Sequence, residues 1–234
     1  MKTIKILNLY SCLGGNRYKW DEVAEKANVK INVTAVELDK ELARLYHERF
    51  PNDEVIIADA HQYLLENYKN FDFIWSSPPC PSHSVTNYFL NSQGVERYPD
   101  MKLYEEIIFL DNFFKGKYCI ENVKPYYTPL IPAKKRGRHL YWTNFNIPNV
   151  LSIREAPKIT ANKARKKDQH KRLCKFHEIE ELLNKYKGGQ DIGKIARNLV
   201  DYEAGKTIFQ TFLGITQKEN NNQIDIFDVI DGSN

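Results

Sequence analysis

The sequence predicts an α/β protein with a doubly wound, mostly parallel sheet. Through the first half of the chain, short apolar stretches typical of strands alternate with stretches that have the spacing of amphipathic helices. Adjacent glycines follow the first apolar stretch, and an acidic residue follows both the second and the third. Parallel strands of such a sheet end at one edge, so these residues are expected to lie together where ligands bind.

The expected elements follow from the same spacing. The stretch Phe-Asp-Phe-Ile-Trp at residues 71–75 is typical of a buried strand, and the prolines at 78 and 79 prevent it from continuing. Apolar residues between positions 103 and 114 recur on one side of a helix. We expect strands at residues 4–9, 31–36, 55–58, 71–75 and 118–120, and helices ending at 27 and spanning 40–50, 60–68, 101–114, 176–186 and 202–212.

The composition fits one full-sized domain with a small appendage. With 234 residues, of which 42% are hydrophobic, the chain can bury a core, and no apolar run is long enough to span a bilayer. The first ten residues lack the features of a signal peptide, which predicts a cytoplasmic protein. The four cysteines have no paired spacing, and His170, Cys174 and His177 have no evident fourth ligand, so neither a disulfide framework nor a metal site is expected.

Positive charge is concentrated in one segment. Between Lys134 and Lys175, thirteen Lys or Arg residues stand against two acidic residues, whereas the whole chain has a net charge of only +4. Such a block favours binding to a polyanion, most often a nucleic acid, although a solvated basic face is the alternative. We divide the chain into a catalytic and cofactor-binding domain at 1–143, a small basic region at 144–189, a returning helical segment at 190–216 and a polar, acidic tail at 217–234.

Cys80 is a candidate nucleophile. It follows a predicted strand and two rigid prolines, Pro78 and Pro79, in the stretch IWSSPPCPSHS. A free cysteine is more often a small buried apolar residue, so this stretch alone leaves a reactive and a structural thiol open. The polar connection that follows, residues 81–100, is long for a compact domain and is typical of a functional lid.

Other residues at the same edge describe an adenosine pocket. Gly14 and Gly15 would let the backbone approach a ligand closely. Glu37 is placed to bind ribose hydroxyls, and Asp59 to accept a hydrogen bond from an adenine amino group. The dinucleotide fingerprint G-x-G-x-x-G is absent. At the end of the fifth strand, a desolvated Glu121 would have a raised pKa and could form a hydrogen bond with a ring nitrogen or protonate it.

Arg136 and Arg138 alternate in the stretch KKRGRHLYW, so they are expected to share one face of a strand. Their planar, permanently charged side chains suit a base carbonyl, a phosphate or a catalytic carboxylate. The order of the motifs along the chain resembles that of the DNA cytosine-5 methyltransferases. These motifs are the Gly-Gly loop, the two acids, Pro-Pro-Cys, Glu-Asn-Val and Arg-x-Arg. The resemblance spans roughly residues 4–142 and resumes in RNLVDYEAGKTIFQTF, where Asn198 would open the last helix of that family.

The resemblance implies a Rossmann-like fold that binds S-adenosylmethionine and acts on double-stranded DNA. Cys80 would add to C6 of a cytosine flipped out of the duplex, Glu121 would bond N3, and the two arginines would hold the base while C5 takes the methyl group. The cofactor-binding residues would be Tyr10, Ser11, Gly14, Gly15, Glu37, Leu38, Asp59, Ala60, Pro78 and Asn198. The residues in contact with DNA would be Ser82, Ser84, Arg165, Lys166 and Lys167.

The resemblance further implies a monomeric, bacterial or phage-encoded enzyme, for which restriction-modification, phage protection and regulation are open roles. The chain departs from the family pattern at Asn8, Ser11-Cys12, Ser77, Pro81 and Lys134, and its basic region is much shorter than a usual target-recognition domain. A tRNA cytosine-5 methyltransferase with the same core and a catalytically inactive DNA-binding relative are the alternatives. An amino-methyltransferase would have an aromatic residue after Ser-Pro-Pro, and a thymidylate synthase would lack the adenosine pocket.

Overall fold

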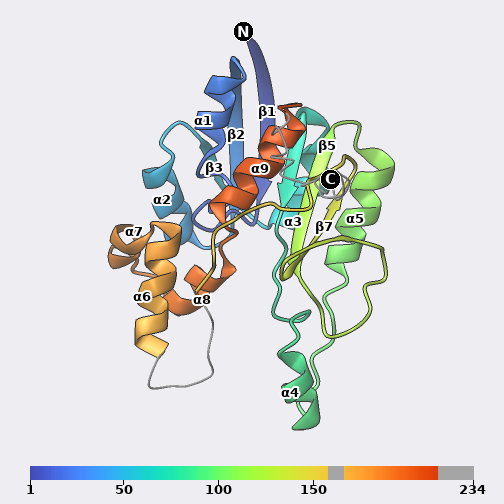
Figure 1. Cartoon of the computed structure of the whole chain (residues 1–234), viewed down its shortest axis with the longest axis vertical. Helices are drawn as coiled ribbons and strands as arrows, with labels where there is room; N and C mark the ends of the chain where they lie inside the picture. The colour runs from blue at the N-terminus through green and yellow to red at the C-terminus, as the bar shows by residue number, and fades with distance from the viewer. Residues whose placement is uncertain (158–165, 216–234) are drawn as a thin grey trace, which may run out of the picture.

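The computed structural model describes residues 1–157 and 166–215, and these form an α/β fold around one seven-stranded sheet (Figure 1). The strand order is β3-β2-β1-β4-β5-β7-β6. Neighbours pair in parallel from β3 to β5, whereas β7 pairs antiparallel with both β5 and β6. The predicted doubly wound, mostly parallel sheet is therefore confirmed. The strands are β1 (Lys2–Leu9), β2 (Val29–Glu37), β3 (Glu54–Ile57), β4 (Phe73–Ser76), β5 (Lys117–Val123), β6 (Lys134–Arg136) and β7 (His139–Thr143).

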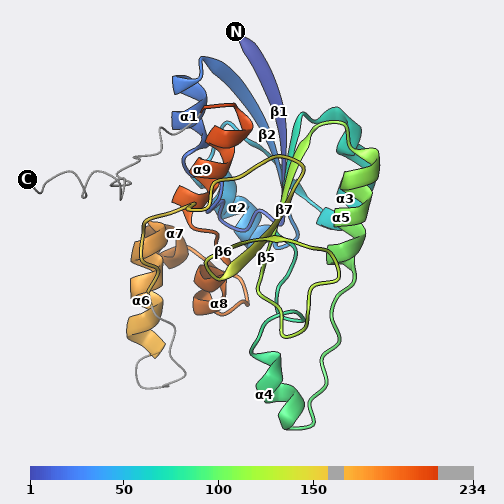
Figure 2. The same cartoon turned by 45° about the vertical axis from the view of Figure 1, so that its right-hand side comes forward.

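Helices cover both faces of the sheet, while the group α6 to α8 and the single helix α4 extend beyond its carboxyl edge (Figures 1 and 2). The α-helices are α1 (Trp20–Lys26), α2 (Lys40–Arg49), α3 (Ala60–Asn67), α4 (Asn87–Ser92), α5 (Lys102–Phe113), α6 (Lys166–His177), α7 (Glu180–Asn184), α8 (Ile192–Asn198) and α9 (Tyr202–Phe212). A short 3-10 helix at Tyr68–Asn70 follows α3. Helix α4 lies within the long connection at residues 81–100 and projects away from the sheet.

Strand β4 shows why the centre of the sheet is apolar on both faces. Its successive side chains point to opposite faces. Phe73 and Trp75 lie in a cluster with Trp20 of α1 and Phe209 of α9, and the rings of Trp20 and Phe209 stack at 5.1 Å. Ile74 lies in the second cluster, with residues of α3 and α5. Because both faces are covered, every residue of this strand is fully buried, as is typical of a central parallel strand.

Helices α6, α7 and α8 form a small helical lobe attached to α2. Leu173, Leu183 and Ile195 from the lobe share one cluster with Leu42 and Leu45 of α2. The predicted boundary at residue 189 falls inside this lobe, which continues to residue 199. The functions predicted for segments 144–189 and 190–216 stay predictions, and the tail at 217–234 lies outside the described residues.

Two helix boundaries differ from the sequence-based expectation. The expected helix at 176–186 is the end of α6 followed by α7, and the break contains Glu178 at a left-handed φ of 56°. The helix expected at 202–212 is confirmed as α9, but Asn198, which the resemblance places at its start, instead ends α8. Helix α9 opens at Tyr202, because the Asp201 carboxylate accepts a hydrogen bond from the Glu203 N–H at 3.2 Å and caps it.

Candidate active site

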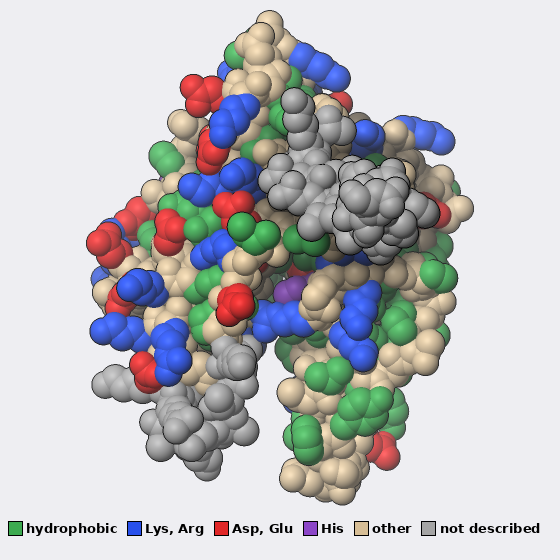
Figure 3. Space-filling view, viewed as in Figure 1, with side chains coloured by type: hydrophobic (Ala, Val, Ile, Leu, Met, Phe, Trp, Pro, Cys, Tyr) green, Lys and Arg blue, Asp and Glu red, His purple; other side chains and the backbone are tan. Residues whose placement is uncertain are grey.

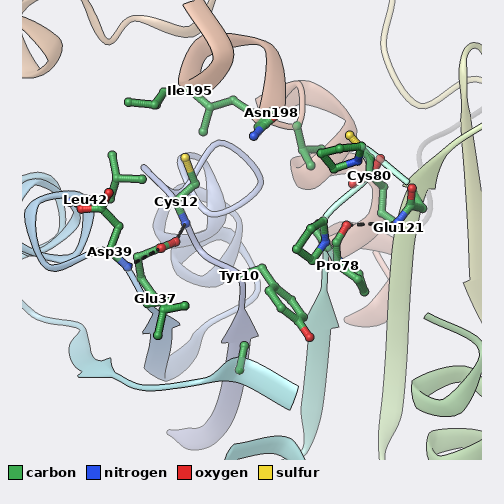
Figure 4. A pocket seen from close by; sticks show the side chains of 18 of the residues that line it. Tyr10, Cys12, Glu37, Asp39, Leu42, Pro78, Cys80, Glu121, Ile195 and Asn198 are labelled. Atoms are coloured by element: carbon green, nitrogen blue, oxygen red, sulfur yellow. Dashed lines mark hydrogen bonds between the residues drawn. The ribbon is translucent and has the colours of Figure 1, made fainter. Parts of the chain in front are cut away.

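A cavity of about 700 Å³ opens at the carboxyl edge of the sheet. Strand ends line one side of it, and α8 with the connection to α9 lines the other (Figure 4). Figure 3 shows the molecule hollowed between the small helical lobe and the projection that carries α4, with Lys and Arg side chains at the inner end of the hollow. The predicted site residues that line the cavity are Tyr10, Glu37, Leu38, Asp59, Ala60, Pro78, Cys80, Glu121 and Asn198.

Glu37 ends β2 and fixes the loop after β1. Its Oε2 accepts a hydrogen bond from the Cys12 N–H at 2.8 Å, and its Oε1 accepts one from the Asp39 N–H at 2.9 Å. Burial raises the pKa of Glu37, and these backbone donors oppose the rise. Each carboxylate oxygen can accept a further hydrogen bond, so Glu37 retains capacity for hydroxyl groups in the cavity.

Asp59 and Leu38 supply two further features of this side. Asp59 caps α3, since its Oδ1 accepts a hydrogen bond from the Gln62 N–H at 2.9 Å, and it is exposed at the cavity. Leu38 lines the cavity although its side chain is 68% exposed, which leaves an apolar surface at the rim. An acceptor beside an apolar surface suits an aromatic base that carries an amino group.

Ser11, Gly14 and Gly15 are not among the described residues that line the cavity. Gly14 has a φ of +66°, and a Cβ there would lie 2.4 Å from the Phe50 ring. A Cβ on Gly15 would lie 2.5 Å from the Val200 carbonyl oxygen. The two glycines therefore let the loop pack against α2 and the α8–α9 connection, and their predicted close approach to a ligand stays a prediction.

Cys12 is a cavity residue that the sequence reasoning treated only as a departure from the family pattern. It lines the cavity and has a φ of +48° without being glycine, a conformation that costs roughly 1–2 kcal/mol. Burial and the neighbouring Glu37 raise the pKa of its thiol, so it stays protonated at neutral pH. The signal was its place in the glycine-rich loop, where the family usually has glycine.

Cys80 lines the opposite side of the cavity and is partly buried. Its carbonyl oxygen accepts hydrogen bonds from the backbone N–H groups of His83 and Ser84, both at 3.0 Å, which closes a turn directly after the thiol. Burial raises the pKa of Cys80 and the charge of Glu121 raises it further, while Arg138 opposes them. The resting thiol is therefore protonated and must lose its proton before it can attack a carbon atom.

Glu121 of β5 lies at the same end of the cavity and is 7% exposed. Burial raises its pKa to about 7, so the carboxyl group can hold or release a proton near neutral pH. The next residue, Asn122, donates its Nδ2–H to the Pro78 carbonyl oxygen at 3.0 Å and ties β5 to the Pro-Pro-Cys segment. His139, which the sequence reasoning missed, lines the cavity with its Nε2 3.6 Å from the Glu121 Oε1.

The two arginines do not share one strand face. Arg136 ends β6, and Gly137 at a φ of +58° turns the chain before Arg138. The Arg136 guanidinium donates to the carbonyl oxygens of Ile147 and Pro148, so it holds a loop and does not line the cavity. Arg138 is close enough to oppose the raised pKa values of Cys80 and Glu121. The expectation of one shared strand face is thus wrong, because β6 ends between the two arginines. Arg138 is not among the described residues that line the cavity either, and the catalytic role of both arginines stays a prediction.

Ser82 and Ser84 lie in the turn after Cys80, at the base of the α4 projection. The Ser82 Oγ accepts a hydrogen bond from the Asp100 N–H at 3.1 Å, and Ser84 forms a β-bridge with Pro125. Both serines therefore hold the two ends of the connection near the sheet.

The predicted basic contacts are described only in part. Lys166 and Lys167 open α6, but their side chains and the whole of Arg165 lie outside the described residues. Lys194 and Arg197 of α8 line the cavity and were missed by the sequence reasoning, which had read this segment as a returning helix. DNA contact by any of these residues stays a prediction.

Two general features of the described residues bear on the site. Within 1–157 and 166–215, no cluster of three or more His, Cys, Asp or Glu side chains could hold a metal ion. His177 in particular is buried, and burial lowers its pKa to about 3. In the same part of the chain, no helix combines the length and apolar character needed to cross a membrane.

The fold and cavity define a class first: a doubly wound α/β fold with a thiol and a carboxyl group at the edge of the sheet where ligands bind. The family model of the C-5 cytosine-specific DNA methylases matches residues 4–129, which is more than half of the chain. The chain belongs to this family.

Solved structures share parts of this fold at low similarity. A DNMT2 variant of Spodoptera frugiperda is 25% identical over 52% of this chain and 36% of that chain, with a TM-score of 0.36. A protein assigned as a DNA modification methyltransferase, encoded within an E. coli prophage, is 20% identical over 53% and 33%, with a TM-score of 0.34. A TehB-like S-adenosylmethionine-dependent methyltransferase of Corynebacterium glutamicum is 15% identical over 56% and 60%, with a TM-score of 0.34.

The matched region spans about a third of the length of the first two of these structures. No match was found among curated proteins. The family assignment therefore depends on the family model, and the substrate and reaction are taken up next as proposals.

Proposed function

We propose that this protein transfers a methyl group from S-adenosylmethionine to C5 of cytosine in double-stranded DNA, through a covalent bond between Cys80 and C6. One observation carries the proposal. The Cys80 thiol and the Glu121 carboxyl, with its pKa of about 7, line the same cavity as the acids Glu37 and Asp59. A nucleophile and a proton donor thus face the reacting base, while acceptors for a nucleoside lie across the cavity.

The residues on the Glu37 side fit S-adenosylmethionine. Glu37 retains acceptor capacity for ribose hydroxyls, Asp59 is placed for the adenine amino group, and Leu38 offers apolar surface to the adenine ring. The ring of Tyr10 lines the cavity between this side and Cys80, and Asn198 closes it from α8 (Figure 4). The cofactor supplies an activated methyl group when it is bound.

On the Cys80 side, the residues of this chain perform the remaining steps. Cys80 loses its thiol proton to solvent, and the sulfur electron pair forms a bond to C6 of the flipped cytosine. Protonated Glu121 bonds N3, so the electron pair of the C5–C6 double bond becomes available at C5. The cofactor, held by Glu37, Asp59 and Leu38, would supply the methyl group that C5 takes. A water molecule then takes the C5 proton, N3 returns its proton to Glu121, the C5–C6 double bond re-forms, and Cys80 leaves as thiolate.

Basic residues around the hollow favour a polyanionic substrate. Lys194 and Arg197 line the cavity, and Arg138 adds positive charge beside Cys80 and Glu121. Such contacts bind phosphates of either nucleic acid. We place DNA first because the family is named for it, and RNA with the same chemistry is the second candidate.

The test is covalent trapping on 5-fluorocytosine, because fluorine cannot leave C5 as a proton does. With S-adenosylmethionine present, duplex DNA carrying this base should form an adduct that survives denaturing electrophoresis. Cys80→Ala should form none, whereas Cys12→Ala, Cys119→Ala and Cys174→Ala should still form it. An adduct in Cys80→Ala would reject the nucleophile. An adduct on fluorinated tRNA but not on DNA would support the second candidate.

A further inference from the structure

A buried carboxylate lies beneath the cavity, outside the residues that line it. Glu106 of α5 has no exposed surface, yet three polar side chains reach it. Its Oε1 accepts a hydrogen bond from the Tyr10 hydroxyl at 2.6 Å and lies 3.1 Å from the His61 Nδ1. Its Oε2 accepts a hydrogen bond from the Ser76 hydroxyl at 2.6 Å. Both hydroxyl bonds, at 2.6 Å, lie at the short end of the range for O–H···O hydrogen bonds.

The partners of Glu106 come from the segments that build the cavity. Tyr10 follows β1 and lines the cavity itself. Ser76 ends β4, four residues before Cys80. His61 lies in α3, two residues after Asp59. One carboxylate therefore connects the adenosine side of the cavity with the start of the Pro-Pro-Cys segment.

Of the three partners of Glu106, Tyr10 is the one that lines the cavity, so Glu106 can affect a bound ligand through Tyr10. Figure 4 shows its ring facing the cavity and its hydroxyl pointing away from Cys80, Glu121 and Asn198. The residue has a left-handed φ of 54°, which is unfavourable for a bulky side chain, and the hydrogen bond to Glu106 fixes the direction in which that side chain points. Burial and Glu106 both raise the pKa of Tyr10, which keeps its hydroxyl protonated as a donor.

We infer that Glu106 is a positioning residue, which fixes the Tyr10 ring as the wall of the cofactor site. The inference rests on the proposed function for the identity of the ligand. A phenylalanine at position 10 would give the same ring without the tether, so the tyrosine hydroxyl and Glu106 act as one unit. The second hydroxyl, from Ser76, leaves no acceptor oxygen of Glu106 without a donor.

The test is a double-mutant cycle read by S-adenosylmethionine affinity in calorimetry. Glu106→Gln leaves only one oxygen acceptor, and Tyr10→Phe removes the tether but keeps the ring. Each should weaken binding by about tenfold, as expected for one lost charge-assisted hydrogen bond. In the double variant the loss should stay about tenfold, because Glu106 acts through Tyr10. A loss near a hundredfold, the product of two independent effects, would overturn the inference.

Tyr118→Phe is the matched control. The Tyr118 hydroxyl donates to the Asp111 Oδ1 at 3.1 Å, so this variant also removes a tyrosine bond to a carboxylate of α5, but away from the cavity. It should leave cofactor affinity unchanged.

Hydrogen exchange gives a readout that needs no ligand. Without cofactor, Glu106→Gln should speed amide exchange in the peptides that carry Tyr10 and Ser76, and Tyr118→Phe should not. Unchanged exchange in both peptides would overturn the inference, whether or not the wild-type protein binds S-adenosylmethionine. Absence of binding by the wild-type protein would instead reject the proposed cofactor.

Discussion

The carboxyl group of Glu121 should make the folded protein less stable above neutral pH. Burial raises its pKa from 4.5 to about 7, so the folded state binds this proton more tightly than the unfolded state does. The stability that the proton contributes is complete below pH 4.5 and is lost as the pH rises through 7. At about 1.4 kcal/mol for each tenfold change in proton affinity, the full loss is about 3 kcal/mol. Glu121→Gln, which stays neutral, should escape it.

Urea unfolding at pH 5 and pH 8 measures this effect. The free energy of unfolding of Glu121→Gln, relative to that of the wild type, should increase by about 2–3 kcal/mol from pH 5 to pH 8. The same variant should form little or no adduct with fluorinated DNA, since the amide supplies no proton to N3. Glu25→Gln, at an exposed position, should follow the wild type at both pH values. A difference between Glu121→Gln and wild type that does not change with pH would refute the raised pKa and the proton-donor role derived from it.

Three further predictions test the cofactor and nucleic-acid sides. Asp59→Ala should weaken S-adenosylmethionine binding by about 1–3 kcal/mol, because it leaves the adenine amino group without an acceptor. Normal calorimetric affinity in both Asp59→Ala and Glu37→Gln would reject the adenosine pocket. Neutralising Arg165, Lys166 and Lys167 together should reduce the salt slope of DNA binding by up to about one unit per lost contact, with cofactor affinity unchanged. Bisulfite sequencing of methylated random DNA should show a target of about two to four base pairs, because so short a region brings few side chains to base edges, and about six or more fixed bases would contradict this.

The sheet and one side of the cavity could be predicted because they depend on short-range patterns. Apolar runs separated by helices require parallel strands, and parallel strands bring the residues after them to one edge. Glu37, Asp59, Cys80 and Glu121 all reach the cavity for this reason. Arg136 does not line the cavity. It is the last residue of β6, at the antiparallel end of the sheet, and Gly137 turns the chain directly after it.

The Gly-Gly pair carries a packing role that the sequence does not reveal. Both positions exclude a Cβ, and such an atom would meet Phe50 at Gly14 and Val200 at Gly15. Phe50 and Val200 come from segments far along the chain. No local pattern states which distant segment will approach a glycine, so only the tertiary structure shows this packing.

Glu106 is the clearest case of a contact that the sequence does not specify. The apolar stripe of α5 includes Leu103, Ile107 and Leu110, and a residue at position 106 falls on the same buried side. A carboxylate there must have partners, since an unpaired buried charge costs several kcal/mol. The sequence thus indicates that Glu106 needs hydrogen-bond donors, but it does not identify them. The donors, Tyr10 and Ser76, are 96 and 30 residues away along the chain. Two donors at the ends of different strands meet on one acceptor only after the sheet has formed. Positioning contacts beneath an active site are therefore the part of a site that sequence patterns specify least, even where they place the reacting groups.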